Sequence, residues 1–435
     1  MSRDTRILEA QLTWTGRSFE PGIQLELRPD GRFGRIGRDL GGDVERLAGR
    51  AVLPGFVNAH SHAFQRGLRG RGQRFPAGAG SFWSWREAMY ELVESLDEEA
   101  VFRWSRQAFA EMRACGITTV GEFHYLHHTG EGEDYRLDEP VIEAAQAAGV
   151  RLVLLYTYYR TGGVPRDGEA PALAGGQRRF HIPSTEAYWQ RMRVLAGRLD
   201  PARERLAAAV HSVRAAPAAE LDAVHREARR RGLAFHIHLE EQRREIEECR
   251  TAYGQGPLQL LLDLGAANGT SAVHLTHSSG EELTRFAQAG GGAVLCAITE
   301  ADLGDGTPDA PAMTTAGLPL ALGSDSNVRI SMLEEMRWLE YGQRLVREER
   351  GVLRHHDAVA ARLLQVATRG GARAIGAPAG ALEPGRWADL VAVDLEHPSL
   401  AGWTAATLAE SLVFGAADGA IAGTCVAGTW DETTA

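Results

Sequence analysis

The sequence predicts an α/β fold, a (β/α)8 barrel with a small β-sandwich domain built from both chain termini. Eight short apolar runs alternate with helical segments along the middle of the chain. These runs are continuous rather than alternating, which is typical of strands buried on both faces. The chain ends instead show short alternating segments with turn signals. The 435 residues exceed the roughly 250–300 that one core accommodates, so a second, smaller domain is expected.

The eight predicted barrel strands begin with the run AVLPGFVNAH and end with LPLALGSD. Consecutive strands separated by helices indicate parallel βα units and therefore a barrel. The predicted strands cover residues 51–60, 116–125, 151–159, 205–213, 233–240, 270–277, 292–299 and 318–325.

Two of the intervening helices are marked by clear end signals. Residues 97–115 begin with acidic side chains, which suit the positive end of a helix, and stop before Gly116. Residues 217–232 start with proline, end in arginines and close on glycine. Both therefore connect one predicted strand to the next.

The two ends of the chain show a different pattern. Residues 5–48 contain short alternating segments with a PDG turn, and residues 378–394 contain short strands with Pro-Gly punctuation. We therefore expect residues 1–50 and 377–435 to form the β-sandwich domain and residues 51–376 to form the barrel.

The composition excludes several functional classes. A formal net charge of −10 argues against a nucleic-acid partner. No apolar run approaches the ~18–20 residues that span a bilayer, and the N-terminus lacks the apolar core of a signal peptide. Cys115, Cys249, Cys296 and Cys425 lie far apart, which favours a reduced cytoplasmic protein without disulfides.

The chain contains no lysine, since all 47 basic residues are arginine. This excludes Schiff-base chemistry and a P-loop lysine. It also excludes a pair of metal ions bridged by a carbamylated lysine.

Histidines and carboxylates gather at the ends of the predicted strands, where a barrel carries its active site. His60 and His62 are two residues apart at the end of the first strand, so both imidazoles point to the same side. Later strands end with further side chains of this kind: His236, His238, Glu240 and Glu241 on the fifth, His274 and His277 on the sixth, and Asp325 on the eighth.

Three histidines and one carboxylate form a ligand set that suits zinc or ferrous iron, with one position left for water. An H-x-H pair alone is more often exposed or part of a core than a ligand, and an aspartate after a strand is usually a helix cap. The coincidence at several strand ends of one barrel is what favours a metal site.

Together these motifs resemble those of the amidohydrolase superfamily. They are PGFVNAHSH on the first strand, H-x-x-E on the fifth, a histidine on the sixth and GSDS on the eighth, with ADLVAVD near the chain end. Longer strings resemble the formimidoylglutamate deiminase family within it: HSHAFQRGLRG, SFWSWREAMY, GEFHYLHH, HSVRA, TEADLGDG and EEMRWLEYGQRL. The resemblance extends over nearly the whole chain.

The resemblance implies one divalent metal ion, with Zn²⁺ as the first expectation and Fe²⁺ as the second. The implied ligands are His60, His62, His238 and Asp325.

On the fifth strand the family pattern places a glutamate three residues after the ligand, which His238 and Glu241 satisfy. His236 shares the strand face of His238 and stays an alternative ligand, as Glu240 stays an alternative to Glu241. His274 matches the position on the sixth strand, and His277 is expected to be peripheral.

The implied reaction is the hydrolytic deimination of N-formimino-L-glutamate, a step of histidine degradation, to N-formyl-L-glutamate and ammonia. Water made nucleophilic by the metal attacks the amidine carbon. Asp325 takes the proton of this water, Glu241 passes a proton to the leaving nitrogen, and His274 stabilises the developing charge.

The resemblance also implies a set of substrate-binding residues, in which arginine would bind the two substrate carboxylates. The set comprises Gln65, Arg86, Tyr125, His211 and Arg214. Alternatively, Arg86 only packs on neighbouring tryptophans, Arg214 lies on the surface at a helix start, and Tyr125 is a core residue. Four further histidines are expected in loops or at the surface: His124, His127, His128 and His181.

Two other functions stay open. One is a different deaminase of the superfamily, acting on a purine, pyrimidine or triazine; the other is a non-catalytic metal-binding barrel. Dihydropyrimidinase-like enzymes commonly use a bridging lysine, which this chain lacks. The expected partner is a small-molecule substrate, with no nucleic acid and no membrane, and a homodimer is an expectation drawn from related barrels.

Overall fold

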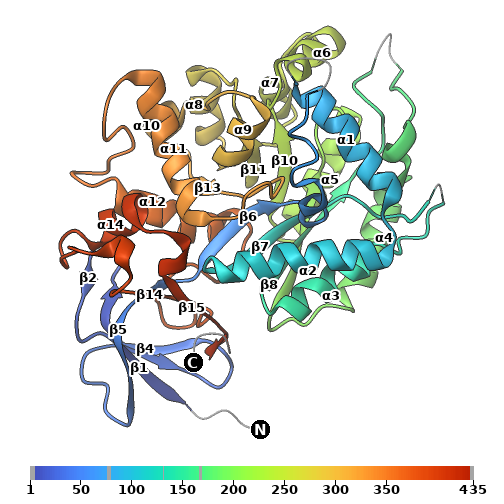
Figure 1. Ribbon diagram of the computed structural model, residues 1–435. Coiled ribbons are helices and arrows are strands. Elements are labelled where there is room, and N and C mark those ends of the chain that lie inside the picture. Colours follow the sequence, from blue (N-terminus) through green and yellow to red (C-terminus); the bar gives the residue numbers. More distant parts are fainter. Residues whose placement is uncertain (1–4, 76–79, 131, 166–168, 432–435) are drawn as a thin grey trace.

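The computed structural model describes residues 5–75, 80–130, 132–165 and 169–431 (Figure 1). A barrel of eight parallel strands is surrounded by helices, and both ends of the chain form a second sheet beside it. The predicted fold class is therefore confirmed.

The barrel strands follow one another in chain order. They are β6 (Phe56–Ser61), β7 (Ile117–His124), β8 (Arg151–Tyr158), β9 (Glu204–Val210), β10 (Phe235–Leu239), β11 (Thr270–His274), β12 (Gly292–Leu295) and β13 (Leu320–Leu322). Strands β7 and β8 are buried at every residue, which explains their continuous apolar sequences. The barrel closes just after β13, where a parallel bridge joins Ser61 to Asp325.

Helices cover the outside of the barrel and part of its mouth. They are α1 (Phe82–Ser95), α2 (Glu98–Ala114), α3 (Asp138–Ala148), α4 (Thr185–Ala196), α5 (Ala218–Arg230), α6 (Arg243–Tyr253), α7 (Pro257–Asp263), α8 (Gly280–Gln288), α9 (Ala297–Leu303), α10 (Ala310–Thr315), α11 (Met332–Arg347), α12 (Ala360–Gln365), α13 (Gly371–Ala374) and α14 (Leu408–Gly415). In the described part of the chain, none of them is long and apolar enough to cross a bilayer. All four cysteines are free thiols, as predicted.

The terminal sheet has the strand order β16-β15-β14-β5-β1-β3-β4, and β2 pairs with β1. Its strands are β1 (Arg6–Trp14), β2 (Phe19–Glu20), β3 (Gln24–Leu27), β4 (Phe33–Gly37), β5 (Val44–Pro54), β14 (Leu390–Asp394), β15 (Ile421–Val426) and β16 (Thr429–Trp430). Alternate residues of β14 pack into two different hydrophobic cores. Val391 and Val393 pack into the barrel core, whereas Leu390 and Ala392 pack into a small core of the terminal sheet.

The predicted first strand, residues 51–60, is in fact two strands in two sheets. Strand β5 runs to Pro54 in the terminal sheet, and β6 starts at Phe56 in the barrel. At the junction the Gly55 amide still bonds to the terminal sheet, donating to the Asp389 carbonyl at 3.0 Å. A Cβ on Gly55 would lie 2.2 Å from the Thr118 side chain, so only glycine fits there. The prediction was wrong because both strands are apolar, and their sequences join without a polar break.

Candidate metal centre and substrate pocket

Four side chains meet at the carboxyl end of the barrel strands. His60 lies in β6, and His62 is the first residue after this strand. His238 lies in β10, and Asp325 follows β13. The Nε2 atoms of the three histidines lie 3.1 to 3.3 Å from one another. Asp325 Oδ1 lies 3.4 Å from Nε2 of His60 and 3.3 Å from Nε2 of His62. All four are buried, so the structure brings together the complete ligand set expected from the sequence.

The spacing of these atoms fits a divalent cation. Ligand nitrogens bound at about 2.0–2.1 Å to one tetrahedral zinc lie about 3.3–3.4 Å apart. The outer nitrogens of two rings are held by carbonyl groups, which can only accept. His62 Nδ1 donates to the Phe123 carbonyl at 2.9 Å, and His238 Nδ1 donates to the His211 carbonyl at 2.9 Å. In the neutral rings the lone pairs of Nε2 therefore face the centre of the cluster.

The charge states also suit a metal site. Burial lowers the pKa of His60 to about 3, and it lowers the pKa values of His62 and His238 as well. The three rings are therefore neutral at pH 7, which is the form that binds metal. Burial alone would raise the pKa of Asp325, but the hydrogen bond to His60 and the charges of the surrounding histidines lower it, so this group is a carboxylate.

The backbone around Asp325 is tightly constrained. Asp325 and His274 adopt the left-handed conformation, with φ of 46° and 79°, which costs a non-glycine residue about 1–3 kcal/mol. A Cβ on Gly323 would lie 2.7 Å from the His60 Cβ, so glycine lets the two segments approach. Asn327, which the sequence analysis did not single out, donates through Nδ2 to the carbonyls of Asp325 and His62.

Glu241 and His274 lie beside the metal-ligand cluster. His274 Nε2 lies 3.7 Å from Glu241 Oε1 and 3.9 Å from Asp325 Oδ2, and His274 Nδ1 lies 3.4 Å from Glu300 Oε1. Burial alone would lower the pKa of His274, but these carboxylates raise it to about 10. Burial raises the pKa of Glu241 to about 7. The site thus holds a cationic imidazole next to a carboxyl group that exchanges its proton near neutral pH.

The alternative residues on the fifth strand point elsewhere. His236 Nε2 donates to the carbonyl of Ala374 at 2.8 Å, away from the cluster. Glu240 Oε1 accepts from the amide of Leu258 at 3.0 Å, and its Oε2 accepts from the Ser278 hydroxyl. Neither residue lines the cavity above the cluster. The structure therefore places His238 and Glu241, rather than His236 and Glu240, at the centre.

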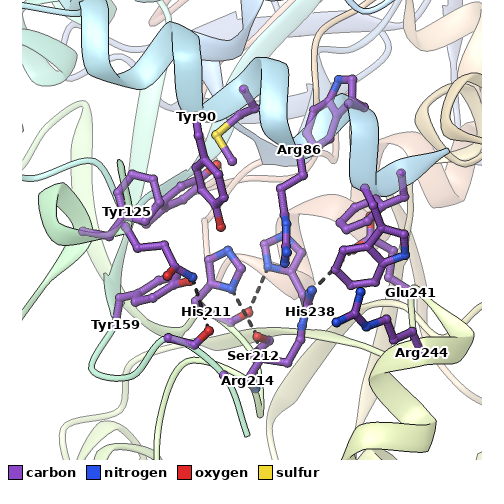
Figure 2. Close-up of a pocket in the computed structure, with 18 of the residues that line it drawn as sticks. Arg86, Tyr90, Tyr125, Tyr159, His211, Ser212, Arg214, His238, Glu241 and Arg244 are labelled. Atoms are coloured by element: carbon purple, nitrogen blue, oxygen red, sulfur yellow. Dashed lines mark hydrogen bonds and ion pairs between the residues drawn. The ribbon is translucent and has the colours of Figure 1, made fainter. Parts of the chain in front are cut away.

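A cavity of about 260 Å³ opens above the cluster, between the barrel and helix α1 (Figure 2). All five residues predicted to bind the substrate line it: Gln65, Arg86, Tyr125, His211 and Arg214. Gln65 Nε2 donates to the Tyr125 hydroxyl at 2.8 Å. Figure 2 shows that Arg86 reaches from α1 into the cavity.

The arginines of the cavity differ in their partners. The side chain of Arg214 is only 11% exposed, and it lies 3.6 Å from Glu245 and 3.9 Å from Glu241. The alternative that Arg214 lies on the surface is therefore excluded. Arg86 lies over the ring of Trp83, with Cζ 4.4 Å from the ring centroid, and within the described residues no carboxylate pairs with it. The guanidinium of Arg86 is thus available to an anion.

Several cavity residues escaped the sequence analysis, among them Tyr90, Tyr159, Ser212 and Arg244. Tyr90 lies one helical turn after Arg86 in the string REAMY, and this i, i+4 spacing was a usable signal. Arg244, in the first turn of α6, also contacts the Trp83 ring at 4.4 Å, which no sequence pattern reveals.

Three of the four histidines expected in loops or at the surface are fully buried: His124, His127 and His128. His127 and His128 do lie in the loop after β7, as expected, whereas His124 lies in β7. His124 Nε2 and His127 Nδ1 lie 2.9 and 2.8 Å from Oδ1 of Asp138, at the start of α3. The prediction was wrong for His124, because its buried partner Asp138 lies more than ten residues further along the chain. Only His181 is partly exposed, as expected.

Comparisons with known proteins identify the family of the chain. A model of the amidohydrolase family matches residues 51–430. A formimidoylglutamate deiminase of Pseudomonas aeruginosa is 38% identical over 415 residues, which cover 94% of this chain and 90% of the relative. A 5-methylthioadenosine/S-adenosylhomocysteine deaminase of Haloquadratum walsbyi is 28% identical over 371 residues, covering 83% and 76%. The crystal structure of an amidohydrolase from Brucella melitensis matches with a TM-score of 0.86 at 32% identity, covering 98% and 94%. The chain is a hydrolase that acts on carbon–nitrogen bonds, and it belongs to the amidohydrolase family.

Proposed function

We propose that this enzyme hydrolyses N-formimino-L-glutamate to N-formyl-L-glutamate and ammonia. The observation that carries the proposal is the cavity above the metal-ligand cluster, which is lined by three arginines, two of which, Arg86 and Arg214, are suited to two carboxylates. Arg214 lies beside Glu241 at the cluster, and Arg86 reaches in from α1. The 38% identity to a formimidoylglutamate deiminase supports the same substrate.

We propose Zn²⁺ as the bound ion, held by His60, His62, His238 and Asp325, since nitrogen-rich ligand sets suit zinc. When bound there, the ion would lower the pKa of a water molecule from 15.7 towards about 7. Ferrous iron is the second choice. The free thiols and the place of the reaction in amino-acid degradation support a cytoplasmic enzyme.

The protein groups divide the proton transfers among them. Asp325 is ionised and accepts a proton from water as the water oxygen attacks the amidine carbon. His274, with a pKa raised to about 10, is a cation that donates a hydrogen bond to this oxygen. Glu241, with a pKa of about 7, delivers a proton to the terminal nitrogen, which leaves as ammonia.

The substrate groups set the orientation of the reacting carbon. Bidentate contacts from Arg214 and Arg86 hold the two carboxylates of the glutamyl portion. The space between the two arginines is faced by His211 and by the hydrogen-bonded pair of Gln65 and Tyr125. Fixing both ends of a flexible acyclic substrate brings the amidine carbon to the cluster.

Other deaminations are less well matched to this cavity. A purine, pyrimidine or triazine ring carries no pair of carboxylates, so such a substrate would leave the charge of Arg86 without a partner in the cavity. A non-catalytic barrel would have no use for the pair formed by Glu241 and His274.

A substrate panel tests the proposal. Zinc-loaded protein is incubated with N-formimino-L-glutamate, guanine and S-adenosylhomocysteine, and the release of ammonia is measured. We expect ammonia from N-formimino-L-glutamate alone. Ammonia release from guanine or S-adenosylhomocysteine, with N-formimino-L-glutamate left intact, would contradict it.

A further inference from the structure

Three tyrosines line the cavity, and they differ in how their hydroxyl groups are satisfied. The Tyr125 hydroxyl accepts from Gln65 Nε2 at 2.8 Å, and the Tyr159 hydroxyl accepts from Gln177 Nε2 at 3.0 Å. The Tyr90 hydroxyl has no hydrogen-bond partner among the residues that the structure describes. Figure 2 shows it pointing from α1 into the cavity. Tyr90 is half-buried, so its hydroxyl can be reached from the cavity and is free to bind a ligand there.

Tyr90 is grouped with cations rather than with acceptors. It lies four residues after Arg86 on α1, so both side chains project from the same face of the helix. The guanidinium carbon of Arg86 lies 5.7 Å from the Tyr90 ring centroid. Both groups offer N–H or O–H donors to the same space, and Arg86 has no carboxylate partner in the described chain. A guanidinium without a carboxylate partner, next to a hydroxyl that can donate, fits an anion.

The helix that carries both residues is held in place by a second arginine. The Trp83 ring, on α1, is contacted by Arg86 and by Arg244 of α6, each with its guanidinium carbon 4.4 Å from the ring centroid. These contacts join the two helices across the mouth of the cavity. The Trp83 ring therefore holds the Arg86 guanidinium in place before a ligand arrives, which reduces the entropy lost on binding.

We propose that Tyr90 is a substrate-binding residue that determines specificity: its hydroxyl and the Arg86 guanidinium together bind one carboxylate of an acyclic dicarboxylate. This inference rests on the proposed function, because it concerns the same cavity. Tyr90 adds a directional donor to the charge of Arg86. An analogue in which that carboxylate is a carboxamide loses most of the benefit, since a hydrogen bond to an ion is stronger than one to a neutral group.

The Tyr90→Phe substitution tests the proposal, because it removes one oxygen and keeps the ring. We expect the KM for N-formimino-L-glutamate to rise roughly 10- to 100-fold, the range for losing a hydrogen bond to a charged group. The kcat and the zinc content should stay unchanged. Tyr341→Phe is the matched control, since Tyr341 lies on α11 outside the cavity. A KM of Tyr90→Phe within twofold of that of the control would overturn the proposal.

Carboxamide analogues identify the carboxylate. The α-carboxamide and the γ-carboxamide of N-formimino-L-glutamate are assayed with the wild-type and Tyr90→Phe enzymes. The KM penalty of Tyr90→Phe should disappear with one of the two analogues and persist with the other. A penalty that persists with both would mean that Tyr90 does not bind a carboxylate.

Direct binding separates this inference from the proposed reaction. Calorimetry measures the Kd of N-formyl-L-glutamate and of glutarate for the zinc-loaded wild-type and Tyr90→Phe proteins. If N-formimino-L-glutamate is not hydrolysed but the Kd values rise at least tenfold in Tyr90→Phe, the reaction is wrong and the inference holds. If the wild type binds neither dicarboxylate, or if both proteins bind them equally, the inference is wrong.

Discussion

His62 and Asp325 are joined through both backbone and side chain. The His62 amide donates to the Asp325 carbonyl at 2.9 Å, while His62 Nε2 lies 3.3 Å from Asp325 Oδ1. The hydrogen bond that closes the barrel therefore also sets the distance between two members of the metal-ligand cluster. Because the first and last strands meet here, closure of the barrel places these two ligands side by side.

The two histidines of β10 should behave oppositely when replaced. We predict that His238→Ala loses bound metal and all activity, because one of three converging nitrogens is removed. His236→Ala should keep one metal ion per chain, since His236 bonds to the Ala374 carbonyl instead. Metal analysis after dialysis measures both. Loss of the metal from His236→Ala alone would reverse the assignment.

The neighbouring glutamates provide a second matched pair. Glu241→Gln should retain metal and lose turnover by roughly 10²- to 10⁴-fold, the usual contribution of a proton-transferring group. Glu240→Gln should retain turnover, because Glu240 faces the Leu258 amide and Ser278 rather than the cavity. Steady-state kinetics with metal analysis measures both. Full activity of Glu241→Gln would assign the proton transfer to another group.

Arg214 should contribute to substrate binding rather than to metal binding. We predict that Arg214→Ala raises the KM for N-formimino-L-glutamate severely, at least 10-fold, while the metal content stays intact. Arg243→Gln serves as a control, because Arg243 lies in the first turn of α6 and does not line the cavity. Unchanged kinetics of Arg214→Ala would remove this residue from the substrate site.

The order of the barrel strands could be predicted because strands buried on both faces leave continuous apolar runs. The same signal failed at Gly55, where two apolar strands of different sheets follow one another. An apolar run indicates where a buried strand lies in the sequence, but it does not reveal with which other strand the backbone pairs. The amide of Gly55 bonds to Asp389, more than three hundred residues further along the chain.

The site could be predicted where the chemistry repeats at strand ends, as at His60 and His62. It could not be predicted where a partner comes from a distant element. The burial of His124 and His127 could not be predicted, because their partner Asp138 lies at the start of the next helix. Arg244 gave no signal, since its contact with Trp83 depends on how α1 and α6 meet above the barrel.

A buried ion pair joins the barrel to the terminal sheet, and its loss should reduce stability without changing the chemistry. Arg151 starts β8, and its guanidinium lies 2.7 and 3.0 Å from the two oxygens of Asp389, both side chains being at most 2% exposed. Asp389→Ala leaves the arginine charge buried and should lower the free energy of unfolding by about 3–5 kcal/mol.

Glu139→Ala is the control: it breaks a half-exposed pair with Arg198 and should lower the free energy of unfolding by only about 0–1 kcal/mol. Urea-induced unfolding measures both variants. Because Arg151 lies at the opposite end of the barrel strands from the cluster, the kcat/KM of Asp389→Ala should match that of the wild type below the unfolding transition. Equal stability of the two variants would show that the ion pair does not hold the terminal sheet to the barrel.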